Sequence, residues 1–149
     1  MSSRVLGVDL GSRRIGLALS DATGVVAGPL SVLQRTGDPV ADHIAILRVA
    51  ADNEAELIVV GIPLSLATGR PGPAALAMLA EVAELAERAA GQNPPVAVET
   101  CDERFTTVTA QRSLAAGGVR AKDRRALVDK VAAAVMLQSW LDGHPRRTS

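Results

Sequence analysis

The chain has 149 residues, of which 48% are hydrophobic and 21% charged, and its formal net charge is zero. This length and composition exclude a disordered chain and predict one domain, residues 1–149, with a largely aliphatic core, because the chain has one Phe, one Trp and no Tyr. A single cysteine excludes an internal disulfide, and the lack of an apolar run of about 18 residues predicts no membrane span and a cytoplasmic location.

Three strands are predicted in the N-terminal part of the chain. Residues 4–10 form a short apolar run that Gly11 ends, which is typical of a buried strand. Residues 15–20 and 25–33 are predicted as the second and third strands. The polar link at 21–24, which contains a glycine, favours a hairpin between them. We therefore expect a three-strand antiparallel meander.

Helices and strands alternate in the rest of the chain. Asp38 as N-cap and Pro39 at the first helical position predict a helix that runs to about Asn53. The later elements are a strand at 56–62, a Pro- and Gly-rich loop at 63–73, a helix at 74–90, a strand at 96–102, a helix from Thr106 or Thr107 to about 116, and a helix from Asp123 to about Leu141. This order predicts an α/β fold in which helices flank a mixed sheet.

Two carboxylates stand in largely apolar surroundings. Asp9 ends the first strand, and alternation places it on the same face as Val5 and Gly7. Asp129 lies in the last helix, with Ala133 beside it on one face. The structural alternatives are a turn cap for Asp9 and a surface position for Asp129. An unpaired carboxylate in a low dielectric costs several kcal/mol, so we favour functional roles.

A third carboxylate is predicted near the end of the last strand. Alternation groups Glu99 with Glu103 and places Asp102 on the other face, so the residues alone leave open which acid faces a site. If the fold gathers this acid with Asp9 and Asp129, their mutual repulsion predicts a bound divalent cation. Carboxylates without His or Cys ligands favour Mg²⁺ or Mn²⁺.

Other polar residues give weaker indications. His43 and His144 lack the spacing of metal ligands and are expected to be structural or exposed. Glu81, Glu84 and Glu87 are expected on a solvated face of the helix at 74–90.

The charges are unevenly distributed along the chain. Residues 52–103 carry two basic and nine acidic groups, whereas residues 104–149 carry nine basic and three acidic groups. Arg outnumbers Lys by 14 to 2, and Arg is the better bidentate ligand for phosphate. A solvated basic surface explains this pattern, and so does a surface for a polyanion beside an acidic pocket.

Three segments resemble the YqgF/RuvX family of Holliday junction resolvases, also described as nucleases of small-subunit ribosomal RNA maturation. They are residues 7–18 (GVDLGSRRIGLA), 102–107 (DERFTT) and 128–133 (VDKVAA), the last followed by Leu137-Gln138. The loop at 61–69 resembles a fourth family element, but it lacks the Asn-x-Asp-Gly often found there.

The resemblance implies an RNase H-like fold and a metal-dependent endonuclease that hydrolyses phosphodiester bonds. It implies catalytic and metal-binding roles for Asp9, Glu103 and Asp129, and so selects Glu103 over Asp102. Two Mg²⁺ or Mn²⁺ ions about 4 Å apart would bind the attacking water and the leaving 3′-oxygen. The family context favours 5′-end maturation of pre-16S ribosomal RNA, so a structured rRNA precursor is the expected substrate.

Basic residues near these segments are expected to contact backbone phosphates. They are Arg13, Arg14, Arg104, Lys122, Arg124 and Arg125. The alternative nuclease is a Holliday junction resolvase, for which a symmetric branched DNA would require a homodimer. Residues 9–16 also resemble the phosphate loop of sugar kinases and actin-like ATPases, but that fold normally needs two such domains. A non-catalytic RNA-binding or assembly module is the remaining alternative.

Overall fold

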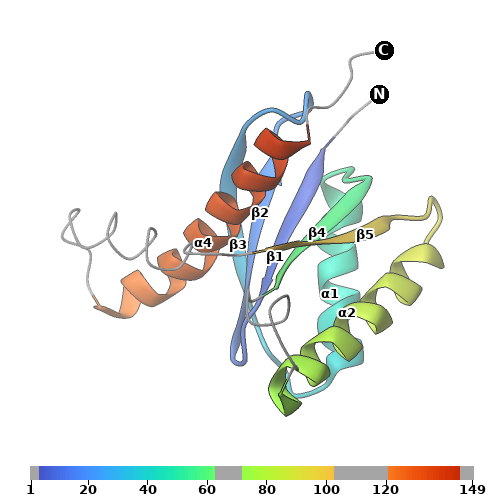
Figure 1. Ribbon diagram of the computed structural model, residues 1–149, viewed down its shortest axis with the longest axis vertical. Coiled ribbons are helices and arrows are strands. Elements are labelled where there is room, and N and C mark those ends of the chain that lie inside the picture. The colour runs from blue at the N-terminus through green and yellow to red at the C-terminus, as the bar shows by residue number, and fades with distance from the viewer. Residues whose placement is uncertain (1–3, 63–71, 103–120, 145–149) are drawn as a thin grey trace.

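The computed structural model describes residues 4–62, 72–102 and 121–144. In this part of the chain a five-stranded sheet lies between helices (Figure 1). The strands are β1 (Val5–Leu10), β2 (Arg14–Ser20), β3 (Ala27–Gln34), β4 (Leu57–Ile62) and β5 (Ala97–Asp102), and the helices are α1 (Pro39–Asp52), α2 (Pro73–Ala90) and α4 (Ala121–Gly143). None of these described helices is long and apolar enough to cross a membrane.

The strand order in the sheet is β3-β2-β1-β4-β5. The pairs β1–β2 and β2–β3 are antiparallel, whereas β1–β4 and β4–β5 are parallel. The predicted meander and mixed sheet are therefore confirmed. The parallel pairs need crossover connections, and α1 and α2 are the helices that precede β4 and β5 in the chain.

Alternation along β1 divides the core into two layers. Leu6 belongs to the cluster that packs against α1 and α2, whereas Val5 belongs to the cluster that packs against α4 on the other face (Figure 1). A Cβ at Gly7 would touch Leu137 of α4, so Gly7 also faces α4. Asp9 follows in the same alternation, so it shares this face with Val5 and Gly7, as predicted, and the structure shows that α4 covers the face.

The strand β3 begins two residues later than predicted. The Asp21 carboxylate accepts hydrogen bonds from the backbone amides of Val25 and Val26 at 2.8 and 3.1 Å. These bonds hold both valines in the turn, where each is 59% exposed. The strand therefore starts at Ala27, where pairing with β2 begins.

The helix boundaries are close to the predictions. The Asp38 side chain accepts a hydrogen bond from the amide of Val40 at 3.1 Å, which confirms it as the N-cap of α1, and Gly91 is the C-cap of α2. Helix α4 extends two residues beyond the prediction at each end. The helix predicted to run to about residue 116 lies outside the described residues, as does most of the loop that follows β4.

Candidate metal and active site

Two glycines let α4 approach the sheet closely. A Cβ at Gly16 would lie 2.1 Å from the backbone oxygen of Asp129, and a Cβ at Gly7 would lie 2.9 Å from the Cβ of Leu137. Gly16 of β2 stands directly opposite Asp9 of β1 in the antiparallel pair. The backbone of α4 at Asp129 therefore rests on the strand beside Asp9, because no side chain intervenes.

The Asp9 carboxylate is partly buried and stands near a second negative charge. Burial, and secondarily the charge of Asp129, raise the pKa of Asp9 to about 6. Within the described residues, no side chain forms an ion pair with the Asp9 carboxylate or donates a hydrogen bond to it. A carboxylate without a counter-charge among the described side chains meets the electrostatic condition that favours a bound cation.

The Asp129 carboxylate has a protein counter-charge. The Nε of Arg14 donates a hydrogen bond to Asp129 Oδ2, and both side chains are partly exposed. Arg14 is the first residue of β2, so the hairpin turn after Asp9 carries this arginine to the site. Arg14 thus neutralises one of the two gathered carboxylates, whereas no side chain in the described part of the chain neutralises the other.

The third predicted carboxylate, Glu103, lies outside the described residues, and no group of three metal-ligating side chains occurs within them. The strand β5 ends at Asp102, which pairs with Ile62 of β4, and β4 runs parallel to β1. The carboxyl ends of these three strands therefore meet at one edge of the sheet, where Asp9 stands. Glu103 directly follows that edge in the sequence, and its preference over Asp102 stays a prediction.

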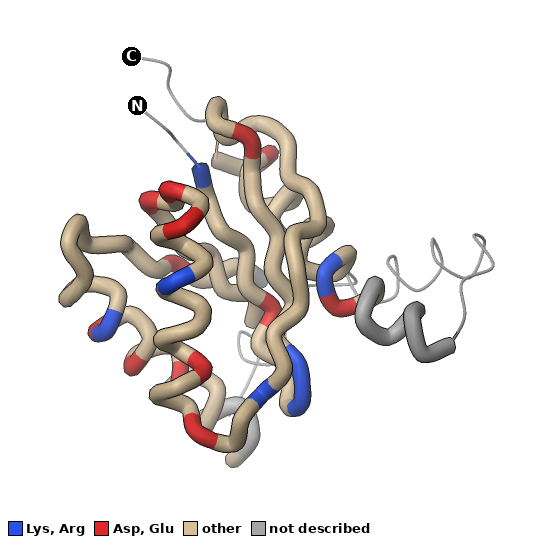
Figure 2. The backbone as a smooth tube through the Cα atoms, turned by 180° about the vertical axis from the view of Figure 1, so that it is seen from behind, with Lys and Arg blue, Asp and Glu red and all other residues tan. Residues whose placement is uncertain are grey.

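The basic residues predicted to bind phosphate lie in the β1–β2 turn, at the start of α4 and outside the described residues. Arg13 is exposed in the β1–β2 turn, and Arg14 is paired with Asp129. The backbones of Lys122, Arg124 and Arg125 lie at the start of α4, and Arg104 lies outside the described residues. Figure 2 shows that many of the described acidic residues are spread over α1, α2 and the neighbouring segments, on the face of the sheet opposite α4.

A buried charged group on the α1–α2 face was not predicted. The Glu81 carboxylate accepts hydrogen bonds from Arg35 Nη1 and Nη2 at 2.6 and 2.9 Å and lies 3.0 Å from Nε2 of His43. The prediction that Glu81 belongs to a solvated face is wrong, because α2 turns this side chain toward α1. His43 is fully buried, which agrees with a structural role. The sequence signal for this group was the pair Asp42-His43, which shares the buried face of α1 with Ile46.

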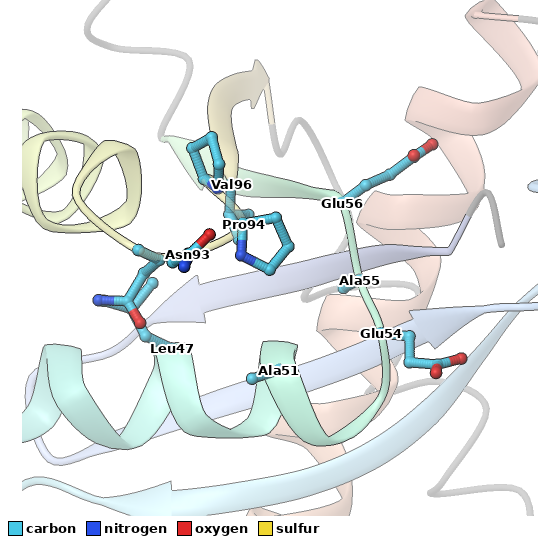
Figure 3. A pocket seen from close by; sticks show the side chains of 10 residues that line it. Leu47, Ala51, Glu54, Ala55, Glu56, Asn93, Pro94 and Val96 are labelled. Carbon is cyan, nitrogen blue, oxygen red and sulfur yellow. The ribbon is translucent and has the colours of Figure 1, made fainter. Parts of the chain in front are cut away.

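A pocket of about 800 Å³ lies between the C-terminal ends of α1 and α2 (Figure 3). It is lined by Leu47 and Ala51 of α1 and by residues within 54–56 and 92–96, which precede β4 and β5. These segments stand at the amino ends of the parallel strands, whereas Asp9 stands near the carboxyl end of β1. The pocket is therefore separate from the gathered carboxylates.

Comparison with known proteins shows which family the sequence resembles over most of its length. A family model described as "RuvX: Holliday junction resolvase" matches residues 3–143. A protein of Mycobacterium sp. (strain KMS) named "Putative pre-16S rRNA nuclease" is 45% identical over 139 residues, which cover 93% of this chain and 79% of that protein. A protein of Mycobacterium leprae (strain Br4923) with the same name is 47% identical over 143 residues, covering 93% and 72%.

Solved structures with the same fold are distant in sequence. Thermus thermophilus RuvC in complex with a Holliday junction substrate has a TM-score of 0.58 at 17% identity, with 95% of this chain and 94% of that chain covered. The yeast mitochondrial Holliday junction resolvase Ydc2 has a TM-score of 0.56 at 13% identity, with 94% and 78% covered. At identities this low, the similarity shows the fold alone. It confirms the predicted RNase H-like architecture.

Proposed function

Because this chain belongs to the RuvX family, we propose that it is a metal-dependent endonuclease that hydrolyses phosphodiester bonds in pre-16S ribosomal RNA in the cytoplasm. The observation that carries the proposal is the Asp9 carboxylate, which is partly buried beside Asp129 and has no counter-charge among the described residues. A carboxylate with a purely structural role would be paired, as Glu81 is with Arg35.

The residues fit a hard divalent cation. Asp9 and Asp129 offer only carboxylate oxygens, and we assign Glu103 as the third ligand from the sheet edge at which β5 ends. The chemistry that bound Mg²⁺ or Mn²⁺ supplies is activation of the attacking water and neutralisation of charge on the phosphoryl group. Asp9 is mostly ionised above pH 6 and becomes protonated below it, so its capacity to bind a cation falls as the pH drops through about 6.

Basic residues of the β1–β2 turn and of the first turns of α4 are suited to bind the phosphate backbone. Arg13 is exposed in the β1–β2 turn, and the Nη groups of Arg14 have no hydrogen-bond acceptor within the described residues, since only its Nε binds Asp129. Lys122, Arg124 and Arg125 stand at the start of α4. Cations at a helix N-terminus oppose the helix dipole, so helix stability does not account for them, whereas phosphate binding does.

The name of the mycobacterial relatives supports pre-16S ribosomal RNA as the substrate. The description of the matching family model supports a second candidate, a four-way DNA junction. Cleavage of a symmetric junction at two strands would require two sites, so this candidate includes a homodimer. The same carboxylates would cleave both substrates, which differ in how their nucleic acid helices are presented to the site.

The decisive experiment compares cleavage of a pre-16S rRNA fragment and a synthetic four-way junction by pure protein under the same Mg²⁺ or Mn²⁺ conditions. We expect cleavage of the RNA, and we expect Asp9→Asn to reduce it by at least about 100-fold while the protein stays folded. Asp52→Asn is the matched control, because Asp52 is exposed at the end of α1, and it should leave cleavage unchanged.

Each other outcome has a distinct meaning. Cleavage of the junction alone, lost in Asp9→Asn, would favour the resolvase. Binding of RNA without cleavage at any metal concentration would favour a non-catalytic RNA-binding module. Full activity in Asp9→Asn would overturn the assignment of the site.

A further inference from the structure

Arg35, the residue that follows β3, binds the turn between β1 and β2 at two points. Its Nε donates a hydrogen bond to the backbone oxygen of Gly11 at 3.0 Å, and its own backbone amide donates to the oxygen of Arg13 at 2.9 Å. Gly11 follows Asp9 by two residues, and Arg13 directly precedes Arg14. The two carbonyls that Arg35 binds therefore lie in the segment that joins Asp9 to Arg14, the partner of Asp129.

The guanidinium of Arg35 is anchored in the helix layer on the opposite face of the sheet. Its Nη1 and Nη2 donate to the Glu81 carboxylate of α2, and Nη1 lies 3.5 Å from Oδ2 of Asp42 in α1. The Arg35 and Glu81 side chains are only 17% and 16% exposed. The hydrogen bonds between them raise the pKa of Arg35 and lower the pKa of Glu81, so both stay charged at neutral pH. A bidentate pair of this kind fixes the orientation of the guanidinium plane.

The backbone of Gly11 packs closely against that of Arg14, which binds Asp129. A Cβ at Gly11 would lie 2.4 Å from the backbone oxygen of Arg14, so these two backbone segments are already in close contact. A shift of Gly11 would therefore move Arg14, whose Nε holds Asp129. An ion pair that only fastened α2 to the sheet would not need the bond from Nε to Gly11.

We propose that Arg35 is a positioning residue: by joining Glu81 to the carbonyl of Gly11, it holds the ends of β1 and β2 in the arrangement that binds the divalent cation. This inference rests on the proposed function. Arg35 does not touch the cation or the substrate. It acts through the β1–β2 turn, as a side chain outside the ligand shell that fixes the ligands.

The test is Arg35→Lys, which keeps the positive charge but loses the planar group that binds Gly11 and Glu81 together. Mn²⁺ binding is measured by calorimetry on the full chain without substrate, and kcat and KM are measured on the cleaved nucleic acid. We expect Mn²⁺ affinity to fall about 10-fold or more, the usual effect of losing a group that orients metal ligands. We expect kcat to fall at saturating substrate while KM changes less than about twofold.

The control is Val82→Ala, next to Glu81 on α2. Val82 is buried in the core, so this variant lowers the melting temperature without touching the turn. We expect its Mn²⁺ affinity to equal that of the wild type. If Arg35→Lys loses thermal stability as Val82→Ala does but keeps wild-type Mn²⁺ affinity, Arg35 is structural and the inference is wrong.

A second variant and a reference separate the remaining outcomes. Glu81→Gln retains Arg35 and a hydrogen-bond acceptor but removes the anchoring charge, and it replaces Arg35→Lys if that variant does not fold. We expect a smaller loss of Mn²⁺ affinity in Glu81→Gln, and wild-type affinity would contradict the inference. The reference is Asp9→Asn: if wild-type Mn²⁺ binding does not depend on Asp9, the proposed function fails, whatever Arg35 does.

Discussion

Asp9 carries its charge in a partly buried position on the α4 face of the sheet, close to Asp129. The two carboxylates differ in their counter-charge: Arg14 neutralises Asp129, whereas no described residue neutralises Asp9. The buried acids on the other face, Glu81 and Asp42, share Arg35 as their counter-ion. Asp9 is therefore the carboxylate whose ionisation opposes folding in the absence of a cation.

This cost predicts that Asp9→Asn stabilises the metal-free protein at high pH. The folded-state pKa of about 6 lies above the ordinary value of 3.8, so above pH 6 the folded state holds an ionised group that it disfavours. With EDTA present, we expect Asp9→Asn to raise the free energy of unfolding at pH 8 by roughly 1–3 kcal/mol. The gain should shrink as the pH falls through 6 and vanish near 3.8. Urea unfolding at several pH values measures it.

The control for this prediction is Asp52→Asn, which removes an exposed carboxylate of the same chemistry. Its unfolding free energy should show no comparable gain at pH 8. A destabilised Asp9→Asn at that pH would mean that the carboxylate has a stabilising partner, and the case for a cation site would lose its basis.

At the scale of elements, the site depends on how α4 sits on the sheet. Gly7 and Gly16 remove side chains from the contact, and Leu137 packs against the first of them. Farther along α4, the Gln138 side chain accepts a hydrogen bond from the amide of Ala27 at 2.8 Å and donates one to the oxygen of Val25 at 3.0 Å. These contacts fix both the distance and the register of α4, and hence the position of Asp129.

We therefore expect Gly16→Ala to disturb both stability and the site. The added methyl group would collide with the α4 backbone at Asp129, so the helix must move away from β2. The expected cost is about 1–3 kcal/mol in urea unfolding, the usual range for overpacking. Asp129 moves away from Asp9 at the same time, so Mn²⁺ affinity measured by calorimetry should fall.

Gly28→Ala in β3 is the matched control, because a Cβ there would meet nothing within 4 Å. It should be close to wild type in both measurements. Wild-type stability and Mn²⁺ affinity in Gly16→Ala would show that α4 is not held by this contact.

At the scale of the whole molecule, the sheet separates two different surfaces. The α1–α2 face carries many of the described acidic groups (Figure 2), whereas the sequence of α4, on the other face, begins with the basic residues Lys122, Arg124 and Arg125. A polyanion would approach the second surface more readily than the first. The net charge of zero conceals this division, because the middle and the end of the chain carry opposite excess charge.

This division predicts how nucleic acid binding depends on salt. Arg124→Ala and Arg125→Ala, made singly, should each weaken binding and reduce the slope of log K against log salt concentration by about 0.7 to 0.9 for each phosphate that the variant no longer binds. Arg48→Ala removes one positive charge from the exposed side of α1 and should leave the slope unchanged. Binding is measured by fluorescence anisotropy with Asp9→Asn, so that the substrate stays intact. If the slopes of Arg124→Ala and Arg125→Ala equal those of Arg48→Ala and of the parent protein, specific phosphate binding at the start of α4 is ruled out.

Sequence alone determined the features that depend on local patterns. The alternation of β1 placed Asp9 on one face with Gly7, Asp38 was identified as an N-cap, and the element order predicted the mixed sheet. These features follow from repeats of two or about 3.6 residues and from caps, which neighbouring residues set. The start of β3 was missed because the hydrogen bonds of Asp21 override the β-propensity of two valines.

Only the tertiary structure decided which charged groups meet. Arg14 and Asp129 are 115 residues apart in the chain, and they pair because Gly16 admits α4 to the surface of β2. Arg35 and Glu81 belong to different elements, and their pairing depends on how α2 packs beside α1. Local periodicity gives the face of each element but not its neighbour across the fold. Contacts between residues distant in the sequence determine how close each helix lies to the sheet and in which register. This packing brought Asp129 to Arg14 and Glu81 to Arg35.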